Sequence, residues 1–471
     1  MLSPAIIQEF EQLCGKENVQ HSSATKLAYS YDATANFQAL PDLVVSPRNT
    51  EEVSGIVKLC QKHEIPIVPR GSGTNLAAGT TPTKGGVVLL FRHMNHILEL
   101  DEENLTVTVQ PGVITDELHA FVEDKGLFYP PDPSSGKIST LGGNISENSG
   151  GLRGLKYGVT KDYVLALEVV LPNGEVIRTG GKLAKDVAGY DLTSLMVGSE
   201  GTLGIVTEAT LKLVPKPNHN QTLLAVFDSL EKAAETVSAI IAAKIIPATL
   251  EFMDQGTIQV VEGYKQIGLP LDAEAILLIE QDGPEEIVAS DMATVLTICE
   301  EYGAREISKA KNEQEAEDLR RARKDALSCL AQLTPTTMLE DATVPRSEIA
   351  PMVREIIRIA EKYDVRIHTF GHAGDGNLHP TAVTDARNEE EMKRVEDAFA
   401  EIFETAVNMG GTITGEHGVG EMKSSYLEWK VGPSGLAIMQ SIKQAIDPNN
   451  MMNPGKMFAK STRKRVVVHN G

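Results

Sequence analysis

Three histidines, three glycines and an aspartate fall within the thirteen residues "HTFGHAGDGNLHP" (368–380), in a chain with eleven histidines in all. The stretch "RIHTF" alternates as a strand does, "GHAGDG" interrupts it, and "NLHPTAV" resumes it. We therefore expect a hairpin with His372 and His379 on facing arms, and with Asn377 and His379 on one face of the second strand. His368 is expected to be a hydrogen-bonded structural residue instead.

Two imidazoles are too few for a metal site, and the next candidates lie in "GGTITGEHGVGEMK" (410–423), where Glu416 and His417 are adjacent. Neighbouring side chains diverge in an extended segment, so one can ligate a metal while the other faces a substrate. His372, His379 and Glu416 then form a His2Glu set suited to Zn, Mn or Fe(II), with positions left for the oxygens of a hydroxy acid. His417 is available as a general base. Spacing alone leaves structural histidines as an equal alternative.

The bulk composition is that of an ordinary globular enzyme, with 41% hydrophobic residues, 23% charged residues and forty glycines. A chain of 471 residues is too long for one hydrophobic core. The net charge of −21 argues against nucleic acid as a partner. Because no apolar run reaches membrane-spanning length and no signal pattern opens the sequence, we expect a cytoplasmic protein.

The chain has four cysteines, which are far apart in the sequence: Cys14, Cys60, Cys299 and Cys329. None of them belongs to a C-x-x-C pair. This spacing argues against a disulfide framework and against an iron–sulfur or zinc-ribbon site within the chain.

Glycine-rich stretches point to a second kind of site. "PRGSGTNLAAG" (69–79) follows an expected strand and offers bare backbone N–H groups to a diphosphate, although Leu76 replaces the third glycine of a dinucleotide fingerprint. A tight turn is the alternative for this loop alone. "PPDPSSGKISTLGGNISENSGG" (130–151) and "MVGSEGTLGIVTEATL" (196–211) share its texture, and we expect loops without secondary structure of their own. Three such loops in one domain indicate a large, extended ligand.

Other elements are expected around these loops. "AIIQEFEQLCG" indicates a leading amphipathic helix, a second helix is capped near Asn49 and Thr50, and Asn173 with Gly174 marks a hairpin turn. The run "KNEQEAEDLRRARKDALSCLAQL" indicates a solvated, charged helix.

Together with "KYGVTKDYVLALEVVLPNGEVIRTGGK", "KDVAGYDLTSLMVGSEGTLGIVTEATLKLVPKP" and "NPGKMF", these loops resemble the PCMH-type FAD-binding fold of the vanillyl-alcohol oxidase superfamily. Within it the chain is most similar to the FAD-linked oxidases that include glycolate oxidase catalytic subunits and D-lactate dehydrogenases. The resemblance covers residues 38–458 and implies an α+β fold, a PCMH-type FAD-binding domain plus a cap domain with an antiparallel sheet flanked by helices. The expected parts are an N-terminal helical segment (1–37), the FAD-binding domain (38–217), the substrate or cap domain (218–410), a C-terminal segment completing the flavin and metal site (411–458) and a basic tail (459–471).

The resemblance also implies the residues that bind FAD. The first loop would wrap the diphosphate, the second would follow the flavin and ribityl chain, and the third would close over the adenine half, with Asn453 and Lys456 near the flavin. These residues are Arg70, Gly71, Ser72, Gly73, Thr74, Asn75, Pro131, Asp132, Ser139, Thr140, Gly142, Gly143, Asn144, Gly198, Glu200, Gly201, Gly204, Ile205 and Asn453. Some members attach flavin covalently in the first loop, but Thr74 and Asn75 are not suitable nucleophiles, so we expect noncovalent FAD.

The implied reaction is oxidation of glycolate or D-lactate by hydride transfer to flavin N5, with a divalent metal chelating the substrate and His417 as base. Similar enzymes carry a comparable H-x6-H and a later E-H, which favours the metal interpretation. Arg323 is the first choice for binding the substrate carboxylate, with Arg320 and Arg321 as competitors. The resemblance alone supports this role, because the run otherwise indicates a charged helix face.

Alternatives remain open at this stage. The substrate can be a larger acid of the D-2-hydroxyglutarate type, the His2Glu site can belong to a metal-dependent hydrolase, or the chain can be a noncatalytic FAD-binding subunit. The electron acceptor is a partner: an Fe–S or second flavin subunit, an electron-transferring flavoprotein, or a quinone. The basic tail is interpreted first as a solvated terminus, while contact with a partner or peripheral binding at the inner face of the membrane stays open, as does a homodimer; its basic residues are Lys460, Arg463, Lys464 and Arg465.

Overall fold

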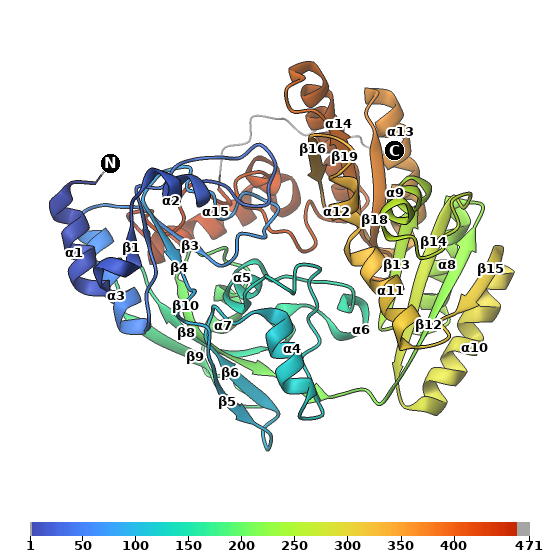
Figure 1. The fold of residues 1–471 in the computed structure, drawn as a ribbon, viewed down its shortest axis with the longest axis horizontal. Helices are drawn as coiled ribbons and strands as arrows, with labels where there is room; N and C mark the ends of the chain where they lie inside the picture. The colour runs from blue at the N-terminus through green and yellow to red at the C-terminus, as the bar shows by residue number, and fades with distance from the viewer. Residues whose placement is uncertain (1, 459–471) are drawn as a thin grey trace. The chain divides into compact units, whose positions relative to one another are not determined.

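The computed structural model describes residues 2–458, so the expected basic tail (459–471) lies outside the described residues. The chain divides into two compact units (Figure 1). Within the described residues, the first unit comprises residues 2–149, 159–216 and 416–458, and the second comprises residues 150–158 and 217–415. None of the described helices has an apolar stretch of the length and hydropathy needed to cross a bilayer.

The first unit is built on a four-stranded sheet and a five-stranded sheet, with a two-stranded pair beside them. Its strands are β1 (Val19–Gln20), β2 (Leu43–Val45), β3 (Ile67–Arg70), β4 (Val87–Leu90), β5 (Ile97–Asp101), β6 (Thr106–Val109), β7 (Leu127–Phe128), β8 (Val164–Val170), β9 (Val176–Gly180), β10 (Ile205–Lys212) and β11 (Val214–Pro215). Its helices are α1 (Pro4–Cys14), α2 (Ser23–Ala28), α3 (Thr50–Lys62), α4 (Thr115–Glu123), α5 (Leu141–Glu147), α7 (Leu192–Met196) and α15 (Leu427–Ile446).

The four-stranded sheet, in the order β1-β2-β4-β3, leads directly into the first glycine loop. Strands β2, β4 and β3 run parallel, and helix α3 forms the crossover between β2 and β3. The strands are Val- and Leu-rich and buried, as parallel strands covered on both faces must be. Helix α1 packs against α3, and Phe10 and Cys14 join the core of this unit. The loop after β3 therefore starts from a rigid base.

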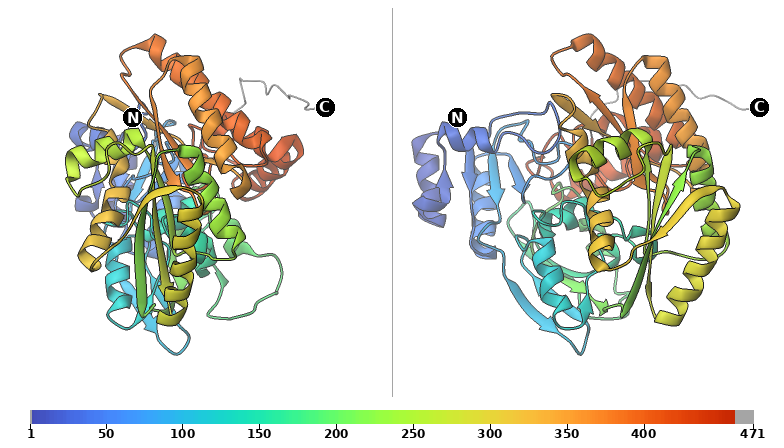
Figure 2. Two further views of the ribbon diagram at one scale, coloured as in Figure 1. Left: turned by 90° about the vertical axis from the view of Figure 1, so that its right-hand side faces the viewer. Right: turned by 45° about the vertical axis from the view of Figure 1, so that its right-hand side comes forward.

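The five-stranded sheet is antiparallel, in the order β5-β6-β10-β8-β9. The turn between β8 and β9 contains Asn173 and Gly174, and the Gly174 φ of 79° is a conformation that glycine adopts readily. After β9 the chain forms an exposed, open loop before it enters α7 (Figure 2). Strand β10 lies at the centre of the sheet and includes the second half of the third glycine-rich stretch (196–211).

The second unit is an eight-stranded antiparallel sheet flanked by helices. Its strands are β12 (His219–Phe227), β13 (Thr249–Asp254), β14 (Ala275–Gly283), β15 (Ala304–Lys309), β16 (Thr336–Leu339), β17 (Ala342–Thr343), β18 (Ile367–His372) and β19 (Asn377–Thr384). Its helices are α6 (Gly154–Tyr157), α8 (Leu230–Ala242), α9 (Gln255–Lys265), α10 (Glu285–Glu301), α11 (Glu313–Lys324), α12 (Ala326–Leu330), α13 (Ile349–Tyr363) and α14 (Glu389–Asn408).

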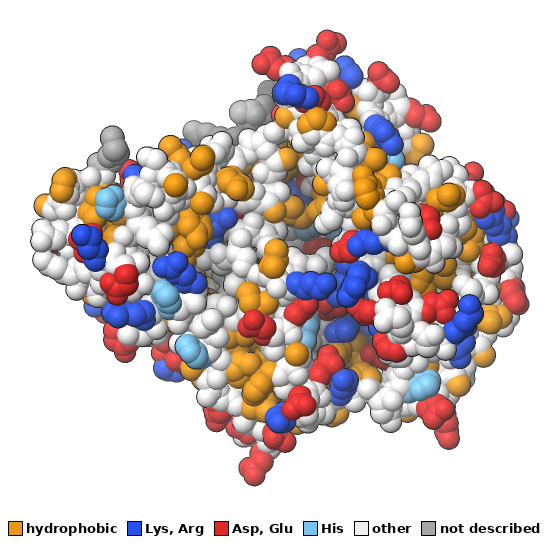
Figure 3. All heavy atoms as spheres, in the orientation of Figure 1, with side chains coloured by type: hydrophobic (Ala, Val, Ile, Leu, Met, Phe, Trp, Pro, Cys, Tyr) orange, Lys and Arg blue, Asp and Glu red, His pale blue; other side chains and the backbone are white. Residues whose placement is uncertain are grey.

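Helices cover both faces of this second sheet (Figures 1 and 2). Helices α8 and α10 pack against one another and on the sheet, whereas α9 packs with α12 and contacts β13, β14 and β18. Nearly every residue of β14 is buried, which is the burial expected of a strand covered on both faces. On the face that Figure 3 shows, acidic and basic side chains are interspersed over the surface of each unit.

Several expected elements are confirmed. Helix α1, the Asn49 cap of α3, the β8–β9 hairpin and the β18–β19 hairpin all form. The expectation of two long loops without secondary structure is wrong in part, because residues 141–147 form helix α5. The Thr140 hydroxyl accepts from the Gly143 amide at its start, and Asn148 ends it in a left-handed conformation (φ 57°). The third stretch is likewise shortened by α7 and β10.

Two glycines in the first unit allow the cost of backbone strain to be measured separately from the cost of steric overlap when each glycine is replaced by alanine. A Cβ at Gly126 (φ 71°) would have no atom within 4 Å, whereas a Cβ at Gly86 (φ 86°) would overlap the Pro66 carbonyl beside β4. We expect Gly126→Ala to lower the free energy of unfolding by about 1–2 kcal/mol from strain alone. Gly86→Ala should cost more than about 3 kcal/mol. Urea unfolding followed by the fluorescence of Trp429, the single tryptophan, measures both; equal costs would contradict the overlap.

Candidate active site

The second unit brings His372 and His379 together on one hairpin. In its register His372 lies opposite Asn377, and Phe370 lies opposite His379. The two imidazole centroids are 5.1 Å apart with an edge-to-face arrangement, and both side chains are buried. The Phe370 ring is 5.5 Å from the His379 ring, so an apolar wall borders the pair. The turn between the arms, with Gly376 at a φ of 86°, lets the two histidines converge.

Glu251 on β13 orients His372. The pairing of β13 with β18 sets Phe252 opposite Gly371, and this register places Glu251 beside His372. Glu251 Oε1 is 2.8 Å from His372 Nδ1, so the carboxylate holds that nitrogen as the donor and leaves Nε2 as the ligand atom. The sequence interpretation missed Glu251. Its signal was a single carboxylate in the otherwise apolar run "ATLEFM", where burial on both faces demands a charged or hydrogen-bonding partner.

Arg323 shares the same carboxylate. Its Nε lies 2.7 Å from Glu251 Oε2, and its guanidinium carbon lies 4.7 Å from the centre of the Phe370 ring. The side chain is only 2% exposed, and its Nη2 is buried without a hydrogen-bond partner among the described residues. The charged helix α11 therefore turns one arginine inward.

The two competing arginines on α11 are placed differently. Arg320 pairs with Glu280 at 2.5 Å and with Glu313 and Glu317, and these partners occupy its guanidinium. Arg321 is exposed. Of the three candidates, only Arg323 joins the cluster around the two histidines.

Glu416 follows directly on Gly415, the last residue of the second unit. Asp341 anchors this point, because its Oδ2 accepts from the Gly415 amide and from the Thr414 hydroxyl, each at 2.7 Å. A Cβ at Gly415 would overlap the Thr343 hydroxyl, so the position requires glycine. The potential ligand atoms of His372, His379 and Glu416 all lie within 4.8 Å of one another. The sequence interpretation missed Asp341 as well; its signal was the acidic pair at the end of "TTMLED".

His368 has a different environment from the other two histidines. Burial lowers its pKa, and it faces Asp254, whose own pKa is raised by burial. Asp254 accepts from the Thr369 amide at 2.6 Å, and Arg366 donates to His368 Nε2 at 3.1 Å. A Cβ at Gly256 would overlap the imidazole. These contacts are those of a packed structural residue.

In the first unit the three glycine-rich stretches meet. A Cβ at Gly71 would overlap the Thr140 hydroxyl, which joins the first loop to the second. The Gly198 amide donates to the Ile145 carbonyl at 2.9 Å, which joins the third to α5. The amides of residues 72–74 form no hydrogen bond with any described residue. Donors of this kind on glycine-rich backbone fit the diphosphate of a dinucleotide.

The side chains of Arg70 and Asn453 contact other groups of the protein. The Arg70 guanidinium is buried beneath the first loop, where a Cβ at Gly73 would overlap it, and burial lowers its pKa. It donates to the Thr80 hydroxyl at 3.2 Å. Asn453 donates to the carbonyls of Gly79 and Glu200 at 2.9 and 2.8 Å. Arg70 thus contacts the residues that follow the first loop, and Asn453 binds the backbone of the first and third glycine-rich stretches.

Several other residues expected at or near the cofactor are buried. Asp132, Ser139 and Asn144 are buried, and the Asn144 amide donates to the Thr115 hydroxyl at 2.7 Å. Lys456 is buried with its Nζ 2.9 Å from both the Thr81 carbonyl and Glu421. Asn144 thus joins helix α5 to helix α4, and Lys456 joins the C-terminal segment to Thr81 and Glu421.

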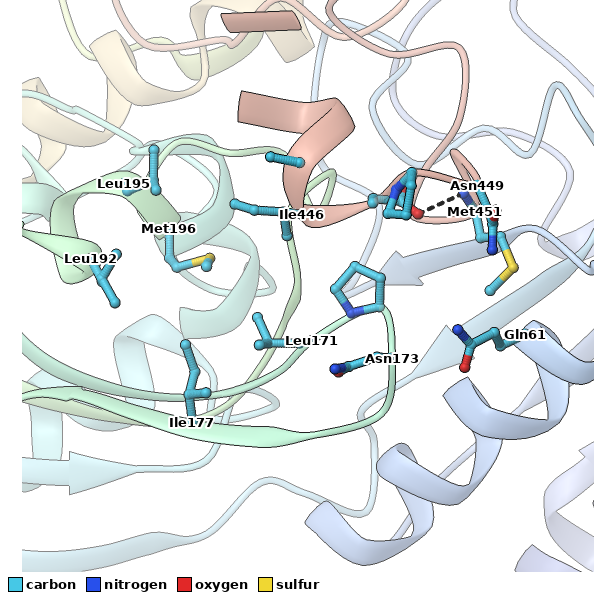
Figure 4. A pocket seen from close by; sticks show the side chains of 14 residues that line it. Gln61, Leu171, Asn173, Ile177, Leu192, Leu195, Met196, Ile446, Asn449 and Met451 are labelled. Carbon is cyan, nitrogen blue, oxygen red and sulfur yellow. Dashed lines mark hydrogen bonds between the residues drawn. The ribbon is translucent and has the colours of Figure 1, made fainter. Parts of the chain in front are cut away.

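A separate cavity of about 470 Å³ lies in the first unit (Figure 4). Its walls are mainly apolar, and none of the expected cofactor, metal or substrate residues lines it. Its lining side chains come from the β8–β9 hairpin, α7, the end of α15 and the segment that follows α15, and they include Leu171, Ile177, Leu195, Met196, Ile446 and Met451. Of the three glycine-rich stretches, only the third lines the cavity, through its first residue, Met196.

Comparison with known proteins matches both halves of the chain to families. Residues 41–180 match the family "FAD binding domain", and residues 216–457 match "FAD linked oxidases, C-terminal domain". Among solved structures, p-cresol methylhydroxylase with substrate bound aligns with a TM-score of 0.81 over 98% of this chain and 97% of its own, at 20% identity. That likeness shows the PCMH-type fold, and it confirms the expected fold class.

Curated relatives cover almost the whole chain. "Glycolate oxidase subunit GlcD" of Bacillus subtilis (strain 168) is 65% identical over 99% of this chain and 100% of its own length. "D-lactate dehydrogenase" of Anaerostipes hadrus is 36% identical over 98% of each chain. "D-2-hydroxyglutarate dehydrogenase" of Stutzerimonas stutzeri (strain A1501) is 33% identical over 98% of this chain and 100% of its own. The chain belongs to the FAD-linked oxidases, a family of flavin-dependent oxidoreductases.

Proposed function

We propose that this chain oxidises a short 2-hydroxy acid, glycolate or D-lactate, to the corresponding 2-oxo acid. The observation that carries the proposal is the convergence of His372, His379 and Glu416 beside a buried arginine, in a family of FAD-linked oxidases. The names of two relatives, a glycolate oxidase subunit and a D-lactate dehydrogenase, point to the same substrate class.

The chemistry requires two events at the substrate. The hydroxyl loses a proton, and the α-carbon loses a hydride carrying two electrons, so that the C–O bond becomes a carbonyl. FAD, when bound, accepts the hydride. The chain itself must bind the carboxylate, fix the α-carbon, and take up the hydroxyl proton.

His372, His379 and Glu416 would hold a divalent cation. The donor set of two imidazoles and one carboxylate suits Zn, Mn or Fe(II) and leaves coordination positions for substrate oxygens. The bond from Glu251 to His372 Nδ1 is the outer hydrogen bond that metal-ligating histidines usually make. The bound cation would supply Lewis-acid chemistry to the hydroxy acid.

Arg323 would bind the substrate carboxylate. Its Nε forms an ion pair with Glu251 Oε2 at 2.7 Å, and neither Nε nor Nη2 has a hydrogen-bond partner among the described residues. A buried donor of this kind is costly until an acceptor arrives, so an incoming carboxylate gains a charge-assisted hydrogen bond. Because Glu251 holds both Arg323 and His372, the carboxylate site and the metal site are tied to one group.

His417 would take the hydroxyl proton. It is adjacent to Glu416, with its Nε2 4.0 Å from Glu416 Oε1, and histidine is the side chain most often used as a general base. General-base catalysis of this kind contributes about 10²–10⁴-fold.

The cofactor is proposed to bind noncovalently. The unbonded amides of residues 72–74 offer the donors for its diphosphate, while Thr74 and Asn75 are not suitable nucleophiles for attachment to the flavin ring. The buried residues of the second and third stretches would contact its remaining parts, as expected for Asp132, Ser139 and Asn144.

Two finer points belong to the same proposal. A larger acid of the D-2-hydroxyglutarate type is the second candidate substrate, because a relative named as a dehydrogenase of that acid matches 98% of this chain. Reduced FAD needs an electron acceptor, and we propose a partner subunit because two relatives are named as subunits of glycolate oxidase. A metal-dependent hydrolase is disfavoured, since both halves of the chain match FAD-linked families.

The first test is anaerobic reduction of the flavin. We expect the purified protein to be yellow, glycolate or D-lactate to bleach it, and acid precipitation to release FAD into the supernatant. Side-by-side kcat/KM values for glycolate, D-lactate and D-2-hydroxyglutarate rank the substrates. A flavin that none of these acids bleaches would contradict the proposed reaction, and colour retained by the precipitate would contradict noncovalent binding.

The metal site is tested by metal content. His379→Ala should abolish a stoichiometric divalent metal, because two ligands remain of three. Glu251→Gln should weaken metal binding by about 10–100-fold, because it loses the charge behind His372. His368→Gln is the matched control and should keep the metal. Mass-spectrometric metal analysis of each variant is the measurement, with FAD absorbance unchanged throughout; metal retained in His379→Ala would count against this ligand set.

Arg323→Lys tests the carboxylate site while keeping a positive charge against Glu251. We expect KM for the hydroxy acid to rise about 10–100-fold, because an ammonium cannot reproduce the guanidinium fork. Arg321→Lys, on the exposed face of the same helix, should leave KM unchanged. Steady-state kinetics of both variants decide between the two arginines, and a larger effect at Arg321 would exclude Arg323.

A further inference from the structure

Glu200 has a backbone conformation that a glutamate rarely adopts. It lies between Ser199 and Gly201 in the third glycine-rich stretch, with a φ of 52°, and its side chain is buried. A non-glycine residue in the left-handed region is disfavoured and persists when surrounding contacts demand it. The contacts of Glu200 therefore have to explain its conformation.

Those contacts tie several segments of the first unit to one residue. The Glu200 carboxylate accepts from the amides of Val419 and Gly420, at 2.6 Å each. The Glu200 carbonyl accepts from the Asn453 side chain at 2.8 Å, and its amide donates to the Ser146 carbonyl at 2.8 Å. The side chain of Glu200 is thus hydrogen-bonded to the backbone of the segment that follows His417.

That segment has little freedom of its own. The amides of Glu421 and Met422 both donate to the Ala77 carbonyl, at 3.0 and 3.2 Å. A Cβ at Gly420 would overlap the same carbonyl, so the backbone approaches the first loop closely. Glu200 binds the amides of Val419 and Gly420. Val419 is the second residue after His417 in the chain.

The charged groups around the Glu200 carboxylate are consistent with its role as a hydrogen-bond acceptor for these two amides. Burial raises the pKa of Glu200, while the two amides, Lys456 and Lys423 lower it. The neighbouring Glu147 has a pKa raised well above its ordinary value by burial and by the charges of Glu200 and Asp32. Of these two carboxyls, Glu200 is the one whose negative charge is met by hydrogen-bond donors.

We infer that Glu200 is a positioning residue for His417, because its carboxylate binds the backbone of residues 419–420 and so fixes the base that precedes them. The inference rests on the proposed function of His417 and extends it. Glu200 was expected to bind the cofactor, but its carboxylate is committed to protein amides, so its effect on the reaction should run through His417.

The test compares two substitutions at position 200. Glu200→Gly relieves the left-handed backbone and removes both hydrogen bonds, whereas Glu200→Gln keeps one acceptor and turns an amide donor toward the other N–H. We expect the anaerobic rate of flavin reduction by the hydroxy acid to fall about 100-fold in Glu200→Gly and about 10-fold in Glu200→Gln. KM should stay within about twofold, and the dissociation constant of FAD should not change.

Glu208→Gln is the matched control, since Glu208 is partly exposed on β10 and pairs with Arg178 at 3.4 Å. Its rate should equal that of the wild type.

A purely structural role for Glu200 predicts the reverse order of rates, with Glu200→Gly faster than Glu200→Gln because glycine readily adopts the left-handed φ. Wild-type rates in both Glu200 variants, or weaker FAD binding as their main effect, would overturn the inference. If Glu200→Gly does not fold, Glu200→Gln decides alone. A wild-type flavin that no 2-hydroxy acid bleaches would instead overturn the proposed function itself.

Discussion

One buried carboxylate organises the second unit. Glu251 is 1% exposed, and it contacts His372 Nδ1 with one oxygen and Arg323 Nε with the other. A charge removed from water at this depth is tolerable only when it is paired, so the three groups depend on each other. The same pairing sets which nitrogen of His372 carries the proton and which side of the guanidinium remains available. The proposed metal site and the proposed carboxylate site therefore depend on a single residue, Glu251.

The first unit meets its ligand with a different kind of chemistry. Its loops offer backbone N–H groups, and the side chains behind them, such as Arg70 and Asn453, hold the loop backbone. Glycines are required where two segments touch, as at Gly71 beside Thr140. A diphosphate is well served by such fixed backbone donors, whereas a metal needs side-chain ligands. The candidate metal ligands are accordingly side chains, two from the second unit and Glu416 from the first, whereas the glycine-rich loops of the first unit offer backbone donors.

The sequence predicted the hairpin and its two histidines because the signal is local, with glycines breaking an alternating pattern over thirteen residues. It did not reveal Glu251, since the bond to His372 joins residues 121 apart and depends on the register of β13 against β18. Asp341 was missed for the same reason, being 74 residues from Gly415. Helix α5 was missed because "LGGNISE" has poor helix formers, and its caps stabilise it. Of the residues chosen by family resemblance, several brace the loops, as Arg70 and Asn453 do.

The adjacent residues Glu416 and His417 are anchored by different groups. On the Glu416 side, Asp341 holds Gly415 through its amide. On the His417 side, Glu200 holds Val419 and Gly420. Because one peptide bond joins the two residues, the distance between the proposed ligand and the proposed base is limited by covalent geometry, and we infer that the anchors on either side determine how the two side chains are directed. A strained glutamate at position 200 is therefore understandable: its conformation costs backbone energy, and the interaction it makes fixes the orientation of a residue two positions away from the amide it binds.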